Sequence, residues 1–351
     1  MKISVLDRDA IGKDIDISGF EKFGNVTVHD RTVAADAVKN IGDADIAVTN
    51  KVRLSAEILA AAPNLKFIAE AATGVDNIDT AFCLEHGIGV ANVPAYSTSS
   101  VAQVTVSLAC MMMTKLDVFC DFCRSGEYTA AGLPNRLVPP FDEFDGKTWG
   151  IIGYGNIGKK VADIARAFGC RVIAYTRTPK PDVECVELDS LLGESDIISV
   201  HCPLTDATRG LIGREEYSKM KKNPLLINVA RGAVLDNDAT VEAVLNGVLG
   251  GFASDVYDKE PFPADHPYVK IKDMKNVCFT PHIAWASVQA RTRLVAEMEK
   301  NVAAFLNGGT DFDERTPPSY GKARFFVFQN ARTELSYKSR SSRAHCRKRG
   351  A

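Results

Sequence analysis

The stretch Trp149-Gly150-Ile151-Ile152-Gly153-Tyr154-Gly155-Asn156-Ile157-Gly158 is a short apolar run that opens into three glycines with G-x-G-x-x-G spacing. Residues 147–152 have the character of a buried strand. One helical face then collects apolar side chains, namely Ile157, Val161, Ile164, Ala165 and Phe168. Gly169 is predicted to end that helix. This order places free backbone N–H groups where a pyrophosphate can bind, so it predicts a dinucleotide site. The alternative is a tight strand–helix turn without a ligand.

Length and charge bound the class of protein. At 351 residues, 46% of them hydrophobic, the chain is expected to form two domains. Residues 311–351 contain ten Lys or Arg and four Asp or Glu, a net charge of +6, so the remainder carries 32 and 40, a net charge of −8. The acidic body argues against a dedicated nucleic-acid surface. Residues 310–351 are predicted to be a basic, disordered tail, with binding to nucleic acid or another anionic surface as the alternative.

Several features predict a cytoplasmic protein without a membrane partner. The N-terminus becomes strand-like at once and lacks the apolar core of a signal peptide. The longest apolar stretch, residues 101–113, is too short for a membrane span. Nine cysteines, an odd number scattered along the chain, favour reduced thiols. Cys120 and Cys123 form a CxxC pair without companion ligands, so a helical face with two thiols is expected and no metal site is predicted; a metal or redox role is the alternative.

Strand and helix signals alternate through the chain. The strand-like segments are residues 2–6, 26–29, 46–49, 65–69 and 89–92, and then 149–152, 171–175, 197–201, 225–229, 251–256 and 277–280. This alternation predicts an α/β fold with two doubly wound parallel sheets. Ser55 is placed to cap the next helix, and residues 126–145 read as a surface loop. The apolar helix from about Ser99 to Lys115 is predicted to lie between the domains, and residues 287–306 are expected to form a helix that returns to the first domain.

Three loops in the second half carry groups that can do chemistry. They contain Arg231, Glu260 and His282, and the carboxyl ends of parallel strands bring such loops to one edge of a sheet. An Arg can hold a carboxylate, and a His beside a Glu can protonate a carbonyl oxygen that receives a hydride. Together they predict a reductase site for an α-keto acid, with reduction favoured at lower pH. Taken singly, the alternatives are a surface salt bridge, a solvated loop charge and a capped loop His. No role is assigned to the other histidines: His29, His86, His201, His266 and His345.

Residues 1–309 resemble the D-isomer-specific 2-hydroxyacid dehydrogenase family. The resemblance rests on five motifs in that family's order: Gly150–Gly158, Asn228–Gly232, Leu235-Asp236, Asp255-Val256 with Glu260-Pro261, and Thr280–Trp285. Residues 49–52, residues 94–103 and Trp285 are similar to the glycerate dehydrogenase and hydroxypyruvate reductase branch. The resemblance implies a Rossmann dinucleotide-binding domain at 99–285, inserted in a flavodoxin-like substrate domain at 1–98 plus 286–309. It also implies a homodimer that uses the helix after Ser99 and residues 126–140.

The resemblance further implies roles for single residues. Arg231 would bind the substrate carboxylate and carbonyl, Glu260 would orient and charge His282, and His282 would be the acid–base. Backbone N–H groups of Thr73, Gly74 and Val75 would help hold the carboxylate. Lys51 either assists a polar substrate or simply ends a strand in water. Cofactor contacts are expected from Gly153, Tyr154, Gly155, Asn156, Ile157, Gly158, Thr176, Arg177, Cys202, Pro203, Thr208, Val229, Ala230, Asp255, His282 and Ala284, with Asp255 on the nicotinamide amide.

The end of the second strand of the dinucleotide domain bears on the cofactor. NAD-using members of the family commonly place an acidic residue there, which binds the ribose 2′-OH. Here residues 174–178 read Ala-Tyr-Thr-Arg-Thr, with no carboxylate before Asp182. Thr176 and Arg177 can bind a 2′-phosphate instead. We therefore expect NAD or NADP, with NADP accepted and the preference between them open.

The sequence thus predicts an oxidoreductase that reduces a small 2-keto acid of the hydroxypyruvate or glyoxylate type. The product would be the D-2-hydroxy acid, NAD(P)H would be the reductant, and the reaction would be reversible. The alternative is a dinucleotide-sensing binding protein, because transcriptional corepressors share the fold and its catalytic residues. The basic tail favours this alternative, whereas the intact substrate loop at residues 73–75 favours the enzyme.

Overall fold

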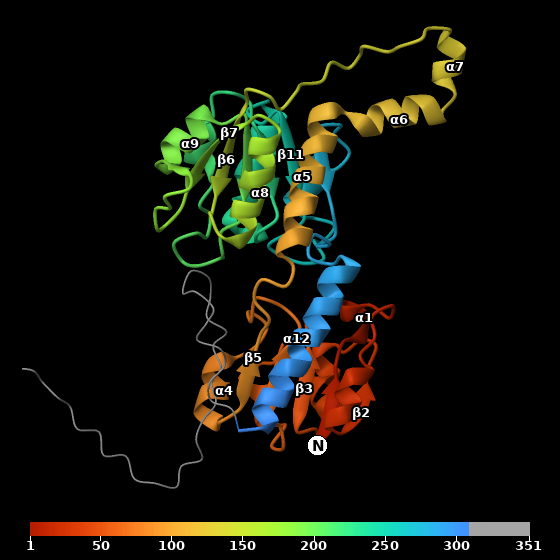
Figure 1. Ribbon diagram of the computed structural model, residues 1–351, viewed down its shortest axis with the longest axis vertical. Coiled ribbons are helices and arrows are strands. Elements are labelled where there is room, and N and C mark those ends of the chain that lie inside the picture. Colours follow the sequence, from red (N-terminus) through yellow and green to blue (C-terminus); the bar gives the residue numbers. More distant parts are fainter. Residues whose placement is uncertain (309–351) are drawn as a thin grey trace, which may run out of the picture.

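The computed structural model describes residues 1–308, which form two α/β domains, each around one parallel sheet (Figure 1). Five strands between residues 2 and 91 make the first sheet, and seven strands between residues 148 and 279 make the second. The predicted fold class, two parallel-sheet α/β domains, is confirmed. The predicted tail at 310–351 lies outside the described residues. Within residues 1–308, no helix combines the length and apolar character needed to cross a membrane.

The five-stranded sheet has the order β2-β1-β3-β4-β5. Its strands are β1 (Lys2–Val5), β2 (Asn25–Val28), β3 (Ile46–Thr49), β4 (Phe67–Glu70) and β5 (Gly89–Ala91). One face is covered by α12 (Val288–Leu306) together with α1 (Arg8–Ile11) and the 3-10 turn at Ser18–Phe23. The opposite face carries α2 (Ala37–Ile41), α3 (Ala56–Ala60) and α4 (Thr80–His86). The strand order reverses between β1 and β3, which is where an open α/β sheet binds ligands.

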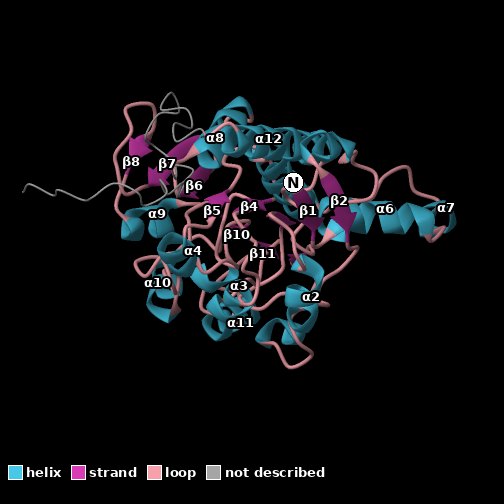
Figure 2. Cartoon of the chain, turned by 90° about the horizontal axis from the view of Figure 1, so that it is seen from below, coloured by secondary structure: helices cyan, strands magenta, loops and turns pink. Residues whose placement is uncertain are grey.

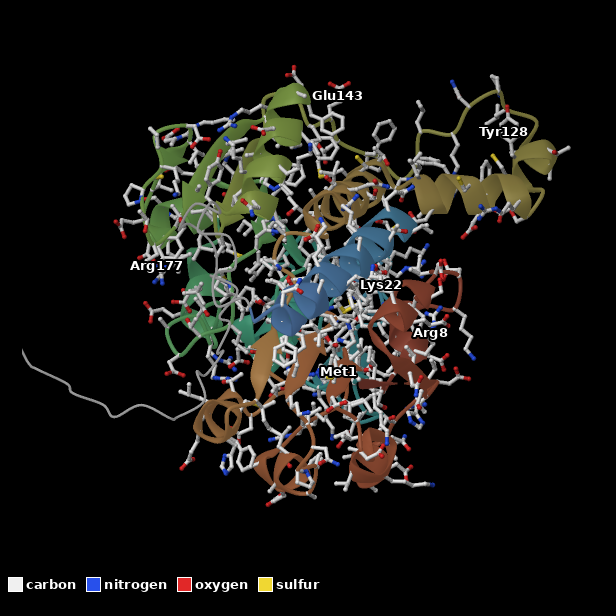
Figure 3. The ribbon with its side chains drawn as sticks, turned by 60° about the horizontal axis from the view of Figure 1, so that its bottom comes forward. Met1, Arg8, Lys22, Tyr128, Glu143 and Arg177 are labelled. Carbon is white, nitrogen blue, oxygen red and sulfur yellow. The ribbon has the colours of Figure 1, made fainter. Side chains whose placement is uncertain are left out.

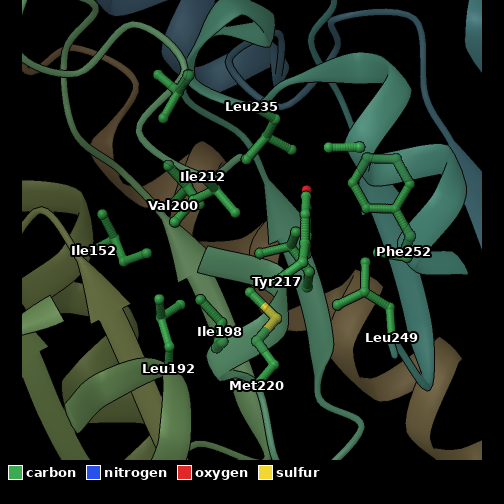
Figure 4. Close-up of a cluster of buried hydrophobic side chains, with 14 of the residues drawn as sticks. Ile152, Leu192, Ile198, Val200, Ile212, Tyr217, Met220, Leu235, Leu249 and Phe252 are labelled. Carbon is green, nitrogen blue, oxygen red and sulfur yellow. The ribbon is translucent and has the colours of Figure 1, made fainter. Parts of the chain in front are cut away.

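The seven-stranded sheet has the order β12-β11-β10-β9-β6-β7-β8. Its strands are β6 (Thr148–Ile152), β7 (Arg171–Tyr175), β8 (Glu184–Cys185), β9 (Ile197–Val200), β10 (Leu225–Asn228), β11 (Gly251–Ser254) and β12 (Val277–Phe279). On one face lie α5 (Thr98–Thr114) and α8 (Asn156–Ala167). On the other lie α9 (Leu188–Glu194), α10 (Arg214–Lys219) and α11 (Asn237–Leu245), whose core is drawn in Figure 4. The glycine stretch, residues 153–158, directly follows β6. It lies at the point where the strand order reverses between β6 and β9.

The elements around the glycine stretch form for local reasons. The residues of β6 are all buried, as a central parallel strand requires. The α8 helix buries Val161, Ala162 and Ala165, and Gly169 follows its end with φ of +85°, as predicted. Phe168 was predicted on the buried face, but it is 41% exposed and stacks on Phe144 at its rim. The Phe lies one turn beyond the part of the helix that faces the sheet.

Three further expectations about local structure were wrong in whole or in part. Ser55 is the N-cap residue of α3, as expected, but its hydroxyl makes no capping hydrogen bond and contacts the Glu57 carboxylate at 3.4 Å. The helix α5 does not lie between the domains, because Val101, Leu108 and Met112 pack into the core beside α8. The segment predicted as a loop at 126–145 contains the helix α7 (Glu127–Ala131). A competing polar partner explains the first difference, and tertiary packing explains the second.

The last helix returns to the first domain, as expected. The N-cap hydroxyl of α12, Ser287 Oγ, accepts from Ala290 N at 3.2 Å. Buried side chains of the helix, including Leu294 and Met298, then pack on the five-stranded sheet. The Ser100 hydroxyl donates to Ala284 O at 2.6 Å and accepts from Ser287 N at 3.3 Å. This hydroxyl therefore joins the two connections between the domains.

Helices α6 (Leu116–Arg124) and α7 extend away from both domains as an arm (Figures 1 and 2). Tyr128 lies near its tip (Figure 3). The predicted helical position of the CxxC pair is observed, since Cys120 and Cys123 are exposed on α6. Large apolar side chains are exposed on the arm and the segment after it: Leu116, Leu133, Leu137, Val138 and Phe141.

Candidate active site

The glycine stretch forms a tight turn between β6 and α8. Gly153 has φ of +96°, and a Cβ there would lie 2.5 Å from Cys202 N. A Cβ on Gly158 would lie 2.4 Å from Gly153 O. The first intrahelical bond of α8 is Lys159 N to Gly155 O at 2.7 Å, so the N–H groups of residues 156–158 precede it and point out of the helix end. The geometry fits a pyrophosphate at this helix N-terminus.

The end of β7 carries a free cation in place of an acid. Arg177 is exposed at the outer edge of the domain (Figure 3), and no acidic partner lies within ion-pair distance of it in residues 1–308. Asp182 forms an ion pair with Lys159 and lies 3.4 Å from Tyr154 Oη. The charge of the first carboxylate after β7 is thus already matched by a lysine.

The other predicted cofactor residues line the ends of β9 and β10 and the loop after β12. Thr208 Oγ1 donates to Pro203 O at 2.6 Å, which folds the loop after β9. Cys202, Val229, Ala230 and Ala284 are buried. Within the described chain, no three His, Cys, Asp or Glu side chains gather as metal ligands.

Glu260 and His282 form the central pair of the site. Glu260 Oε2 lies 2.6 Å from His282 Nδ1, and Glu260 Oε1 accepts from Tyr257 N at 3.1 Å. Burial acts to raise the pKa of Glu260, but the hydrogen bond and charge of His282, the Tyr257 N–H and Lys51 outweigh it and leave that pKa below its usual value. An ionised Glu260 can only accept, so His282 Nδ1 carries a proton and Nε2 is left for acid–base work.

Asp255 holds the loop that presents His282. This carboxylate is buried, and Oδ1 accepts from Ile283 N at 2.8 Å and Thr280 Oγ1 at 2.6 Å. Asp255 Oδ2 accepts from Ala284 N at 2.9 Å. The backbone of His282 is left-handed, with φ of +55°, a conformation that a non-glycine residue keeps only when its surroundings impose it. Both oxygens of Asp255 therefore serve the His282 loop, a function that the sequence reading missed.

Arg231 lies in a turn that is held by hydrogen bonds of the Asn228 side chain. Asn228 Oδ1 accepts from Ala230 N at 3.1 Å, and Asn228 Nδ2 donates to Arg231 O at 3.0 Å. A Cβ on Gly232 would lie 2.0 Å from the Tyr257 carbonyl carbon, so the Arg231 turn packs directly on the loop that carries Glu260. The three predicted catalytic residues are thus brought together by contacts between their loops.

The predicted substrate loop lies against Arg231. A Cβ on Gly74 would be 2.7 Å from Arg231 Nη2, and Thr73 is held by its hydroxyl, which donates to Val93 O at 3.1 Å. The N–H groups of residues 73–75 donate to no acceptor in the described part of the chain. They are consequently available to an anion beside the guanidinium group.

Lys51 enters the site from the end of β3. Its backbone N–H donates to Asp7 Oδ2 at 2.6 Å, and its ammonium lies 3.7 Å from Glu260 Oε2. Asp7 also accepts from Asn50 N at 3.0 Å. Burial raises the pKa of Asp7, although these backbone N–H groups act to lower it. This function of Asp7 was not predicted, because its partner loop lies more than 40 residues away in the chain.

Glu70, at the end of β4, is a further buried carboxyl group, in addition to Asp255 and Asp7. Its Oε2 accepts from Asn77 Nδ2 at 3.2 Å, while Oε1 has no partner within residues 1–308. Burial raises the pKa of Glu70 well above its usual value; the Asn77 hydrogen bond opposes this shift and the nearby charge of Asp7 adds to it. Asn77 Nδ2 also lies 3.1 Å from Val52 O, so Glu70 supports both the Lys51 loop and the substrate loop.

This raised pKa predicts how stability depends on pH. The folded chain holds the Glu70 proton more tightly than the unfolded chain, so stability from this group is fully present below the unfolded value and is lost as pH rises toward the folded value. Glu70→Gln keeps an acceptor for Asn77 without a charge. We expect it to raise the free energy of unfolding by about 1–3 kcal/mol at pH 8 and to have little effect near pH 4.

Urea unfolding between pH 4 and 8 measures this difference. Glu143→Gln removes the same group from an exposed position and is the matched control, expected to change stability little at either pH. A Glu70→Gln variant less stable than the wild type at pH 8 would show that the carboxylate itself is needed.

His266 has a structural function that was also missed. It is buried, its Nδ1 accepts from Tyr268 N at 3.1 Å, and its Nε2 therefore donates to Asp258 Oδ1 at 2.8 Å. Asp258 lies in the same loop as Glu260. The pair consequently anchors the loop that supports His282. Asp258 and His266 lie eight residues apart in the chain, a spacing that matches no motif.

The chain is similar to known dehydrogenases over most of its length. Residues 106–284 match the model of the D-isomer specific 2-hydroxyacid dehydrogenase NAD binding domain. A hydroxypyruvate reductase from Blautia hydrogenotrophica is 37% identical over 317 residues, covering 88% of this chain and 98% of the relative. A glycerate dehydrogenase from Methylorubrum extorquens is 35% identical over 308 residues, covering 88% of this chain and 96% of the relative.

Solved structures share the fold over most of the chain. The D-lactate dehydrogenase from Aquifex aeolicus, complexed with NAD and lactic acid, has a TM-score of 0.77 at 29% identity, covering 88% of this chain and 96% of that one. An acyclic imino acid reductase in complex with NADPH and D-Arg has a TM-score of 0.77 at 28% identity, covering 88% and 98%. Fold and site thus define an oxidoreductase that uses a nicotinamide dinucleotide. The chain belongs to the D-isomer-specific 2-hydroxyacid dehydrogenase family.

Proposed function

We propose that the protein reduces a small 2-keto acid of the hydroxypyruvate or glyoxylate type to the D-2-hydroxy acid with NAD(P)H, reversibly. The observation that carries the proposal is the 2.6 Å contact between His282 Nδ1 and Glu260 Oε2 on the loop beside Arg231. The relatives named hydroxypyruvate reductase and glycerate dehydrogenase support this substrate class. Membership in an enzyme family also favours catalysis over the dinucleotide-sensing alternative.

The residues divide the chemistry among them. A bound dihydronicotinamide supplies the hydride to the keto carbon. Arg231 and the N–H groups of residues 73–75 hold the substrate carboxylate, which fixes the face of the carbonyl that is presented. His282 Nε2 gives a proton to the carbonyl oxygen, and Glu260 stabilises the imidazolium that does so. Since reduction consumes a proton, its rate relative to oxidation rises as pH falls.

A substrate panel tests the proposal. Hydroxypyruvate, glyoxylate and pyruvate are each incubated with NADH and with NADPH, and the absorbance of the reduced nicotinamide is followed. We expect steady turnover, fastest with hydroxypyruvate or glyoxylate, and a D-configured product on chiral chromatography. No consumption with any keto acid would support the sensor instead.

We propose that NADPH is accepted, because Arg177 is exposed at the end of β7 and Asp182 is paired with Lys159. A charge-assisted bond to a 2′-phosphate contributes about 1.5–3 kcal/mol, or roughly ten- to a hundredfold in affinity. We expect Arg177→Gln to weaken NADPH binding by about tenfold and NADH binding by less than twofold, measured by fluorescence titration. Wild-type enzyme with a hundredfold preference for NADH would contradict the proposal.

We further propose that the domains divide at residues 1–98 plus 286–309 and 99–285, and that two chains form a homodimer through the helix after Ser99 and residues 126–140. Exposed Leu133, Leu137 and Val138 support this surface, since large exposed apolar patches mark contact sites. Light scattering should give twice the chain mass, and Leu137→Asp should shift it toward the monomer. A cytoplasmic location is proposed from the reduced state of the described cysteines.

A further inference from the structure

Two ion contacts join the opposite walls of the candidate site. Lys51 Nζ lies 3.7 Å from Glu260 Oε2, and Asp76 Oδ2 lies 3.6 Å from Arg231 Nε. Lys51 and Asp76 belong to loops of the five-stranded sheet, whereas Glu260 and Arg231 belong to loops of the seven-stranded sheet. Glu260 and Arg231, both proposed to act in the reaction, thus each face an opposite charge from the other domain.

Asp76 stands next to the place where a substrate carboxylate would bind. It follows Gly74 by two residues, and a Cβ on Gly74 would lie 2.7 Å from Arg231 Nη2 and 3.2 Å from Asp76 Oδ2. The guanidinium group, the Asp76 carboxylate and the N–H groups of the substrate loop therefore share one small region. The Asp76 side chain is 79% exposed, so it is free to turn and remains in contact with solvent.

We propose that Asp76 is a specificity-determining residue that selects 2-keto acids with an uncharged side chain. The inference rests on the proposed function. Arg231 carries one positive charge, which Asp76 and the substrate carboxylate would share. A second carboxylate or a phosphate on the substrate would add its charge to that of Asp76 beside Arg231, whereas Lys51 lies at the Glu260–His282 pair. Two negative charges that lie close together repel each other even near a protein surface.

The test compares pyruvate with oxaloacetate, which differ by one carboxylate, in wild type and Asp76→Asn. We expect Asp76→Asn to raise kcat/KM about tenfold for oxaloacetate and less than threefold for pyruvate. The change should lie in KM, with kcat nearly constant, because Asp76 does not take part in proton or hydride transfer. The effect of Asp76→Asn on kcat/KM for oxaloacetate should shrink in 0.5 M NaCl, since salt screens exposed charges. An equal change for both substrates, or a loss with oxaloacetate, would overturn the proposal.

A control variant and a binding measurement separate this proposal from the proposed function. Glu85→Gln removes a carboxylate from an exposed position of α4 in the same domain and should leave both substrates unaffected. Calorimetric titration of the NADH-bound protein with oxamate and oxalate, which carry one and two charges, needs no turnover. Asp76→Asn should raise the affinity for oxalate relative to oxamate about tenfold. An unchanged ratio overturns the inference, whereas absence of turnover with all keto acids overturns only the proposed function.

Discussion

Replacing His282 with asparagine is expected to lower kcat for keto acid reduction by a factor of about 10²–10⁴, the usual contribution of a general acid. Asparagine is chosen because it tolerates the left-handed backbone that position 282 adopts, with φ of +55°. The Asp255 carboxylate would still hold the loop through Ile283 N and Ala284 N. The variant should therefore lose the proton donor without losing the shape of the site.

Two measurements check this result. Stopped-flow kinetics give kcat, and quenching of protein fluorescence by NADH gives the Kd, which should stay within about twofold of the wild type because the other expected dinucleotide contacts are retained. The kcat of Glu260→Gln should lie between those of the wild type and His282→Asn. Glutamine keeps a hydrogen bond to His282 Nδ1 but lacks the negative charge that stabilises the imidazolium. Retention of more than a tenth of the wild-type kcat in His282→Asn would refute the assignment of the proton donor.

The second large effect is expected from Gly153→Ala. Position 153 has φ of +96°, and the new Cβ would lie 2.5 Å from Cys202 N and 2.8 Å from Cys202 Cα. These are backbone atoms at the end of β9, so the contact cannot be relieved by a side-chain rotation. We expect a loss of about 2–5 kcal/mol in the free energy of unfolding, from the strained backbone and the overpacking together. Affinity for NADH should fall at least tenfold, because the loop must move away from β9.

Gly87→Ala is the matched control. Gly87 has φ of +71°, but a Cβ there would meet nothing within 4 Å. It should therefore show the backbone cost alone, about 1–2 kcal/mol, with unchanged NADH binding. Urea unfolding and fluorescence titration of both variants measure the two effects. Equal losses of stability in Gly153→Ala and Gly87→Ala would mean that the close approach to β9 is unimportant.

The elements of the fold were predictable where their pattern is local and sustained. The strand before the glycine stretch and the helix after it are found as β6 and α8, because an apolar run and a one-sided helical period need only their own residues. The return of α12 followed from its length and period. The strand β8 was missed because two residues are too few to show a period. The helix α5 was misplaced because its apolar residues do not reveal which domain they contact.

The candidate site was predictable in its residue types and less so in its contacts. Motifs along the chain identified Arg231, Glu260 and His282, and the structure brings their loops together. Asp255 was expected at the nicotinamide, yet both of its oxygens are engaged by the His282 loop. The support that Asp7 gives to Lys51, and His266 to the Glu260 loop, joins residues that no spacing rule relates.

The sequence by itself determined the class of chemistry, because strand, glycine turn and helix are local patterns and the Arg, Glu and His motifs each lie within a few consecutive residues. Only the tertiary structure decided which charges face one another across the site. Lys51 meets Glu260 and Asp76 meets Arg231 because two separately folded sheets present their loops to a common space. The tertiary structure also explains why position 153 must be glycine. The sequence suggested room for a phosphate, but the backbone that follows β9, at Cys202, passes so close that no side chain fits there.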